Sequence, residues 1–92
     1  MAYAGQVRDA SVTLTASSAP VLTFNGNRRF LLAQNPGSAN AGVNMAGGVA
    51  AIGGSGTVTL APGSGVFLDE FVPQNAITAI GTAGQPLTIL EG

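Results

Sequence analysis

The sequence predicts an all-β protein, a small antiparallel β-sandwich of jelly-roll or immunoglobulin-like type with about eight short strands and no substantial helix. Short segments in which polar and apolar residues alternate, such as Thr57–Leu60, are typical of strands with one buried face. Turn-forming residues recur about every ten positions, which favours an antiparallel sandwich or barrel. A β-solenoid is the weaker alternative, because no fixed repeat period emerges.

The chain is predicted to begin with an arm and one long strand. Residues 1–6 show no hydrophobic periodicity, so we expect a flexible N-terminal arm ahead of a single domain, residues 7–92. Ser11–Ala16 alternates polar residues with apolar ones and includes β-branched side chains. This pattern predicts a strand from about Val7 to Ala16.

A hairpin is predicted next. Val21–Phe24 has the composition of a short strand, and the Asn25-Gly26 dipeptide that follows is a strong signal for a two-residue hairpin turn. Arg28–Asn35 then forms the returning strand. Its Phe30–Ala33 centre is apolar on both faces, which favours a central strand buried between two layers.

The middle of the chain is rich in glycine and is predicted to contain little regular structure. Val43–Met45 alternates as a short strand, and Val49–Ile52 is either a further strand or the wall of a loop. A helix is disfavoured here, because glycines such as Gly47 and Gly48 flank a run too short to nucleate one.

Two strands, Thr57–Leu60 and Val66–Leu68, are separated by Pro62-Gly63. Proline fixes the backbone angle at the first central position of a turn, and glycine tolerates the positive φ that often follows. The segment is therefore predicted to be a hairpin that ends at Asp69-Glu70.

Two further strands, Ala76–Ile80 and Pro86–Leu90, complete the predicted sandwich. The alternation pattern also predicts its hydrophobic core. The expected core residues are Val12, Leu14, Leu22, Phe24, Phe30, Leu32, Val58, Leu60, Phe67, Ile77, Leu87 and Ile89.

Charge is scarce in this chain. Charged residues make up 8% of the 92 residues, compared with roughly a quarter in ordinary soluble domains, and the net charge is −1. No side chain between Phe30 and Leu68 is ionisable. Low net charge favours association, so we expect much of the surface to contact neighbouring subunits. A soluble monomer with an uncharged polar coat is the alternative.

The residue inventory argues against catalysis. The chain has no histidine, cysteine or lysine, so the commonest general base and the thiol and amine nucleophiles are missing. Neither a cofactor nor a metal site is predicted, and the glycine-rich segments lack the remaining residues of phosphate-binding loops. We expect no enzyme activity and no small-molecule substrate. The longest apolar stretch, Ala41–Ile52, is too short to span a membrane, and no secretory signal is visible.

Two dipeptides carry most of the charge. Arg28-Arg29 is the one pair of adjacent basic residues, and Asp69-Glu70 is the one pair of adjacent acidic residues. Nucleic acid is not an expected partner, because binding it needs a wider basic patch and usually aromatic platforms. An arginine that faces inward would need a carboxylate partner. The arginines either contact a carboxylate across a subunit interface, for instance Asp69 or Glu70, or form a solvated strand edge that discourages aggregation.

Through several short motifs and their order, the chain resembles small structural proteins of tailed bacteriophages. The motifs are Arg29-Phe-Leu-Leu-Ala-Gln-Asn35-Pro-Gly, then Leu60-Ala-Pro62-Gly63 with Phe67, and finally Asn75-Ala-Ile-Thr-Ala-Ile-Gly with the closing Leu87-Thr-Ile-Leu-Glu91-Gly92. The resemblance covers roughly residues 28–92 and consists mostly of turn glycines and strand hydrophobes.

The resemblance implies a non-catalytic virion component, assembled in the host cytoplasm. Its most specific form is a capsid decoration or cement protein that binds the major capsid protein and forms a dimer or trimer with itself. A head-fibre or tail accessory protein is an alternative, and a carbohydrate-binding β-sandwich module is another, although its usual stacking tryptophans are missing. The expected partner-contact residues are Met1, Tyr3, Gln6, Arg28, Arg29, Asp69, Glu70 and Phe71.

Overall fold

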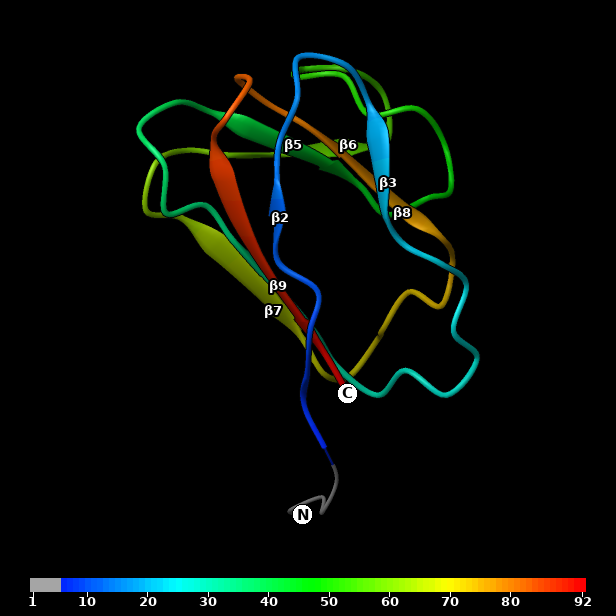
Figure 1. The fold of residues 1–92 in the computed structure, drawn as a ribbon. Helices are drawn as coiled ribbons and strands as arrows, with labels where there is room; N and C mark the ends of the chain where they lie inside the picture. Colours follow the sequence, from blue (N-terminus) through cyan, green and yellow to red (C-terminus); the bar gives the residue numbers. More distant parts are fainter. Residues whose placement is uncertain (1–5) are drawn as a thin grey trace.

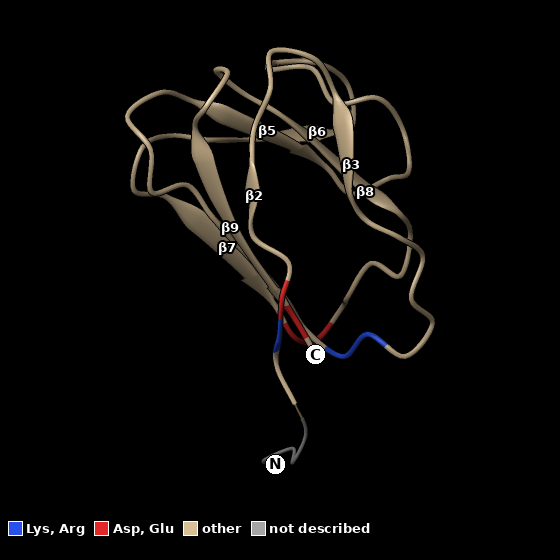
Figure 2. Ribbon diagram, in the orientation of Figure 1, with Lys and Arg blue, Asp and Glu red and all other residues tan. Residues whose placement is uncertain are grey.

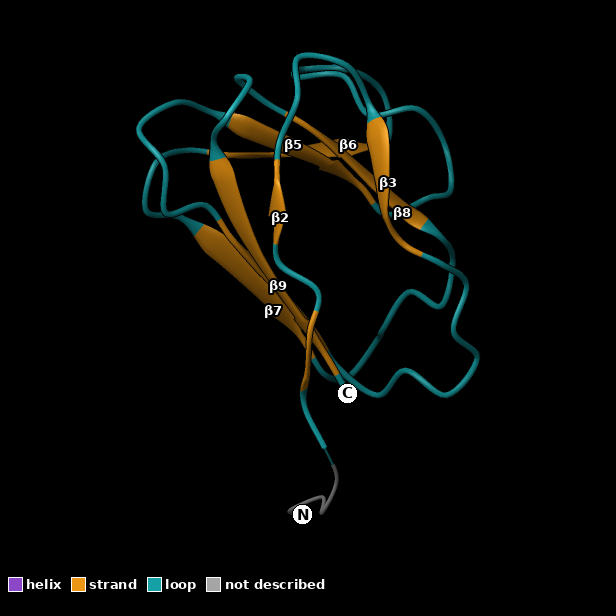
Figure 3. Ribbon diagram, viewed as in Figure 1, coloured by secondary structure: helices purple, strands orange, loops and turns teal. Residues whose placement is uncertain are grey.

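The computed structural model describes residues 6–92, which form a β-sandwich of two antiparallel sheets (Figure 1). Strands and loops make up the described residues, with no helix among them, and so none that could span a membrane (Figure 3). The strands are β1 (Arg8–Asp9), β2 (Val12–Thr13), β3 (Ala19–Leu22), β4 (Leu31–Gln34), β5 (Ala41–Asn44), β6 (Thr57–Leu60), β7 (Gly65–Leu68), β8 (Ile77–Ile80) and β9 (Pro86–Glu91). The all-β prediction is confirmed.

The strand order identifies the sandwich as a jelly roll. One sheet has the order β1-β9-β4-β7, with β2 also paired to β9, and the other has the order β3-β8-β5-β6. With β1 and β2 counted as one interrupted strand, the first half of the chain pairs antiparallel with the second half in reverse order. The chain is thus one long hairpin, with its tip at residues 45–56, rolled into two sheets.

This rolled topology overturns two predicted hairpins. β3 pairs with β8 and β4 with β7 and β9, so the connection around Asn25-Gly26 crosses from one sheet to the other. Neither residue has the positive φ that a two-residue hairpin turn of type I′ requires. The Pro62-Gly63 turn also links different sheets, because β6 pairs with β5 while β7 pairs with β4. Gly63 does adopt the predicted positive φ, at 82°.

The first predicted strand is also broken. β1 and β2 are separated by Ala10 and Ser11, where the Ala10 N–H donates to the Ile89 carbonyl and the Ser11 hydroxyl accepts from the Ile89 N–H. A side chain has replaced a backbone partner at this point, which locally disrupts the ladder. The segment Val49–Ile52 is not a strand and belongs to the long 45–56 loop.

The core lies between the two sheets and is built from aliphatic side chains. The predicted core residues Leu14, Leu22, Leu60, Ile77, Leu87 and Ile89 are buried, as are Leu31, Ala33, Ala41, Val43, Ala50 and Ala79, which the sequence analysis did not select. Val12, Phe30 and Leu32 are half-buried.

Three predicted core residues are wrong, because Phe24, Val58 and Phe67 are exposed by 70%, 40% and 59%. Register explains the error at Phe67, which lies opposite Leu32 in the β4–β7 pair. β4 turns Leu31 and Ala33 inward, so Leu32 and its cross-strand neighbour face outward. Phe24 lies beyond the end of β3, and Val58 lies on the edge strand β6.

Candidate interaction surface

The charged residues of this protein gather at one end of the sandwich (Figure 2). The three arginines and four carboxylates are Arg8, Asp9, Arg28, Arg29, Asp69, Glu70 and Glu91. We call this end, together with its connections 23–30 and 69–76, the charged end. The turns at the other end, and most of both sheets, carry no charge.

The charged end has a buried ionic centre at Glu91, the last residue of β9. The Glu91 carboxylate is almost fully buried and accepts from Arg28 Nε at 3.0 Å and from Asn25 Nδ2 at 3.1 Å on one oxygen. Its other oxygen accepts from Arg8 Nε at 2.9 Å and Nη2 at 2.6 Å. A buried carboxylate is stable only when its lone pairs are occupied in this way.

Arg28 extends this centre to the two connections of the charged end. Its side chain is fully buried, and its terminal nitrogens donate to the backbone carbonyls of Thr23, Pro73 and Asn75. The guanidinium therefore ties residues 23–30 and 69–76 to the end of β9. Its five donors in a fixed planar fork suit it to this task better than a lysine would be.

The surroundings of Glu91 alter its titration. Burial by itself would raise the pKa of Glu91, but hydrogen bonds from Asn25, Arg28 and Arg8, together with the charge of Arg28, outweigh burial and lower the pKa below its usual value. A hydrogen bond from the Ser11 hydroxyl, followed by one from the Ser11 backbone N–H, also lowers the pKa of Asp9. Both carboxylates are thus ionised at neutral pH.

The exposed part of the charged end combines mixed charge with aromatic rings. Arg29, Asp69 and Glu70 line a shallow depression of about 330 Å³. A second depression lies beside it, and Val72 and Gln74 line both. Phe71, which is 85% exposed, lines the neighbouring depression. A surface of this composition can form ion pairs and bury aromatic area against a protein partner.

Several predicted contact residues therefore meet in space. Arg29, Asp69, Glu70 and Phe71 surround the two depressions, and the Gln6 carbonyl lies beside Gly92 at the same end. Met1 and Tyr3 lie outside the described residues. Arg28 is different: its carboxylate partner is Glu91 of the same chain, and its buried side chain cannot present a charge to a neighbour.

Sequence reasoning missed Glu91 and Asn25. The signal for Glu91 was available, because Leu87, Ile89 and Glu91 are spaced by two and so lie on the same, inward face of a strand. A carboxylate in that position requires a cationic partner, and the sequence offers three arginines. Nothing local identifies Arg28 as that partner.

A second surface feature is the outer face of the β7–β4–β9 sheet. Leu32 lies opposite Phe67 on one side and Leu90 on the other, and these three apolar side chains face outward. The Phe30 ring meets the Phe67 ring edge-on, with centroids 5.8 Å apart. Such a cluster of side chains is apolar and only partly covered by its own chain.

The outer face of the other sheet is covered by the chain itself. The 45–56 loop packs over it, with Asn44 Nδ2 donating to the Val49 carbonyl and Thr78 Oγ1 to the Gly48 carbonyl. The N–H of Ala50 donates to the Ser18 hydroxyl, and Ala50 itself is buried. The two faces of the sandwich are therefore not equivalent.

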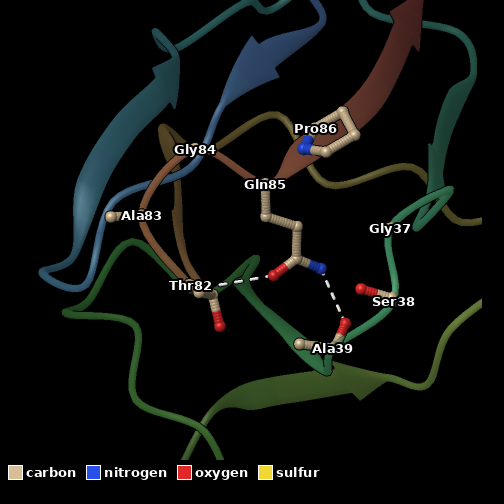
Figure 4. A pocket seen from close by; sticks show the side chains of 8 residues that line it. All are labelled: Gly37, Ser38, Ala39, Thr82, Ala83, Gly84, Gln85 and Pro86. Atoms are coloured by element: carbon tan, nitrogen blue, oxygen red, sulfur yellow. Dashed lines mark hydrogen bonds between the residues drawn. The ribbon is translucent and has the colours of Figure 1, made fainter.

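The uncharged end holds a pocket that a hydrogen-bonded glutamine side chain crosses (Figure 4). The pocket has a volume of about 280 Å³, and the Gln85 side chain lies across it, accepting from the Thr82 N–H and donating to the Ala39 carbonyl. Gln85 also donates to the fully buried Asn35. These amides hold the turns together, and no buried side-chain nitrogen or oxygen of the described residues lacks a hydrogen-bond partner.

Comparison with known proteins identifies no relative of this chain. Searches with protein-family models, against curated proteins and against solved structures find no match to this chain.

Proposed function

We propose that this chain is a non-catalytic structural protein of a bacteriophage virion, specifically a capsid decoration or cement protein that binds the outer face of the major capsid shell and stabilises it. The proposal rests on the resemblance of residues 28–92 to small structural proteins of tailed phages. The jelly-roll strand order supports it only by analogy, since viral capsid proteins and lectins share that architecture without sharing a function.

The charged end is the surface through which we expect the chain to bind the shell. It brings together all of the Arg, Asp and Glu residues of the chain, and it adds two exposed rings, Phe24 and Phe71. The described part of the chain also begins at this end of the sandwich (Figure 1). Aromatic anchors with a charged rim are the usual composition of a protein-binding surface. Many identical weak contacts on a symmetric shell then add up through multivalency.

Co-sedimentation with undecorated shells tests this assignment. Phe71→Asp should lower the occupancy of the shell at least tenfold, because it replaces an 85% exposed ring at the charged end with a charge. Val49→Asp is the matched control, because Val49 is 77% exposed but lies in the 45–56 loop. Equal binding of both variants would remove the charged end from the interface.

The arm is tested separately. Deletion of residues 1–6 should weaken shell binding, because an arm that reaches a neighbouring subunit adds contact area. Unchanged occupancy would show that the arm does not contribute.

Cryo-electron microscopy of the virion distinguishes a protein on the shell from a head-fibre or tail accessory protein. Failure to find the chain in purified particles would refute the virion assignment altogether.

A carbohydrate-binding module is the second candidate. The exposed rings of Phe24 and Phe71, together with the jelly-roll order, favour it, because sugars stack on aromatic faces and several lectins are jelly rolls. A calorimetric titration with glycans separates the two functions: saturable binding by the isolated chain supports the module, and its absence supports the shell protein.

A further inference from the structure

The two lateral sides of the sandwich differ in how their edge strands are protected. On one side, β1 and β2 form the edge of one sheet and β3 forms the edge of the other. β1 and β2 have two residues each and carry Arg8 and Asp9, while β3 contains Pro20 and shifts register between Pro20 and Leu22. Short strands, charges, prolines and register shifts are the devices that prevent an edge from pairing with another chain.

The other side, formed by β6 and β7, has none of these devices. No charged residue and no proline occurs in either strand, and both keep a regular register with their neighbours. Val58 on β6 and Phe67 on β7 are exposed apolar side chains. An unprotected, apolar edge is a surface suited to pairing with another strand.

The hydrogen-bond alternation shows which groups of β7 are available. The Asn35 N–H donates to the Ser64 carbonyl, so the backbone groups of Ser64 point toward β4. Because every second residue of a strand points to the same side, the backbone groups of Val66 and Leu68 also bond to β4. The backbone groups of the intervening residues, Gly65 and Phe67, then point away from β4 toward the edge.

We propose that a second copy of this chain pairs with the β7 edge, antiparallel and about a two-fold axis at Val66. In this register Gly65 of each copy faces Phe67 of the other, and each such pair exchanges two N–H···O bonds. The pairing satisfies the edge groups of both residues without using any residue outside β7.

Side-chain chemistry favours this register. Gly65 and Phe67 lie on the same, outward face, so each Phe67 ring covers the glycine of the other copy, an arrangement that stabilises glycines in β-sheets. Asp69 would face Gly63, and Glu70 would face Pro62, so no two like charges oppose one another. A net charge of −1 leaves little repulsion between copies.

A second copy is a better occupant than an unrelated strand because the edge is complementary to itself. The same rotation also brings the two β6 edges toward one another, since β6 and β7 lie on the same side of the sandwich. The inference concerns a different surface from the charged end, so it does not depend on shell binding and can fail or succeed independently of it.

Disulfide formation between single-cysteine variants tests both the contact and its register, because the chain has no cysteine of its own. In Val66→Cys the two cysteines would face each other in a non-hydrogen-bonded pair, with Cα atoms about 4.5 Å apart, which a disulfide can bridge. In Phe67→Cys they would be diagonal, at about 7–8 Å, and out of reach. Thr13→Cys, on the protected edge strand β2, is the second control.

We expect oxidation to link Val66→Cys into dimers at least tenfold faster than either control. Preferential linkage of Phe67→Cys, or equal linkage of all three variants, would overturn the proposed pairing. The mass of the unmodified chain in solution provides a test that needs no substitution: we expect a dimer of two 9.0 kDa chains, and a monomer at every concentration would refute the inference.

Substitution of the edge gives a third readout. Phe67→Lys should shift the mass to that of the monomer, because it places a charge at the centre of the pairing, whereas Val49→Lys should leave the dimer intact. Circular dichroism confirms that each variant is folded. A Phe67→Lys variant that is folded and still dimeric would exclude β7 as the interface.

Discussion

Replacement of Glu91 by glutamine tests the assignment of the buried ionic centre. The carboxylate of Glu91 holds the guanidinium of Arg28, whose side chain is fully buried, at 3.0 Å. Glutamine keeps the shape of the side chain and one acceptor oxygen, but it removes the negative charge. Glu91→Gln would therefore leave the charge of Arg28 buried without a counter-charge.

The expected loss of unfolding free energy is about 3 kcal/mol. Removal of one partner from a buried ion pair typically costs about 3–5 kcal/mol. The lower value applies because Arg28 keeps its three backbone carbonyl acceptors, from Thr23, Pro73 and Asn75. The bond from Arg8 adds little, since the Arg8 side chain is 63% exposed and such pairs contribute about 1 kcal/mol or less.

Urea and thermal unfolding followed by circular dichroism measure this loss. In a domain of this size 1 kcal/mol corresponds to about 4–8 °C, so the midpoint should fall by about 12–24 °C. Glu70→Gln is the matched control, because Glu70 is an exposed carboxylate at the same end and should change stability by about 0.5 kcal/mol or less. Equal stability of Glu91→Gln and Glu70→Gln would refute the reasoning.

Three further predictions concern the same fold. Because the pKa of Glu91 is lower in the folded chain than its ordinary value of 4.5, the contribution of its charge to the free energy of unfolding is complete above pH 4.5 and is lost as the pH falls through the folded pKa. Stability measured against pH in the acid range should show this loss, and Glu91→Gln should flatten the curve. Gln85→Leu should cost about 1–3 kcal/mol in urea unfolding, since it removes the acceptor of the Thr82 N–H and one of the two donors to each of Asn35 Oδ1 and the Ala39 carbonyl; an unchanged midpoint would contradict this role. Gly63→Ala should cost about 1 kcal/mol through backbone strain alone, because φ is 82° and the added carbon meets no atom within 4 Å; a stabilised variant would disagree with that φ.

The all-β class could be predicted from the sequence because alternation and turn chemistry are local. Thr57–Leu60 alternates and is a strand, and Gly63 adopts the backbone conformation that its place in the turn requires. Strand pairing is not local. Asn25-Gly26 has the composition of a hairpin turn, yet it lies in a connection that crosses from one sheet to the other. In this connection Asn25 Oδ1 accepts a hydrogen bond from the Asn27 N–H.

The buried polar centres could be predicted only in part. The spacing of Glu91 with the inward residues of β9 indicates its face, but its partner Arg28 lies 63 residues away in the sequence. No local pattern distinguishes Arg28, which is buried, from Arg29, which is exposed. The predicted contact residues that the structure describes nevertheless lie at the charged end, where the fold brings the few Arg, Asp and Glu residues of the chain together.

The β7 edge and the charged end impose a joint constraint on assembly. β7 runs toward the charged end, since Asp69 and Glu70 follow it directly. Two copies paired antiparallel through β7 therefore place their charged ends at opposite poles of the dimer. One flat shell can then contact only one pole at a time. A dimer locked by a disulfide at Val66→Cys should consequently bridge undecorated shells into aggregates that scatter light, and reduction should disperse them. A locked dimer that covers single shells without bridging them would show that the two surfaces cannot both have the roles assigned to them.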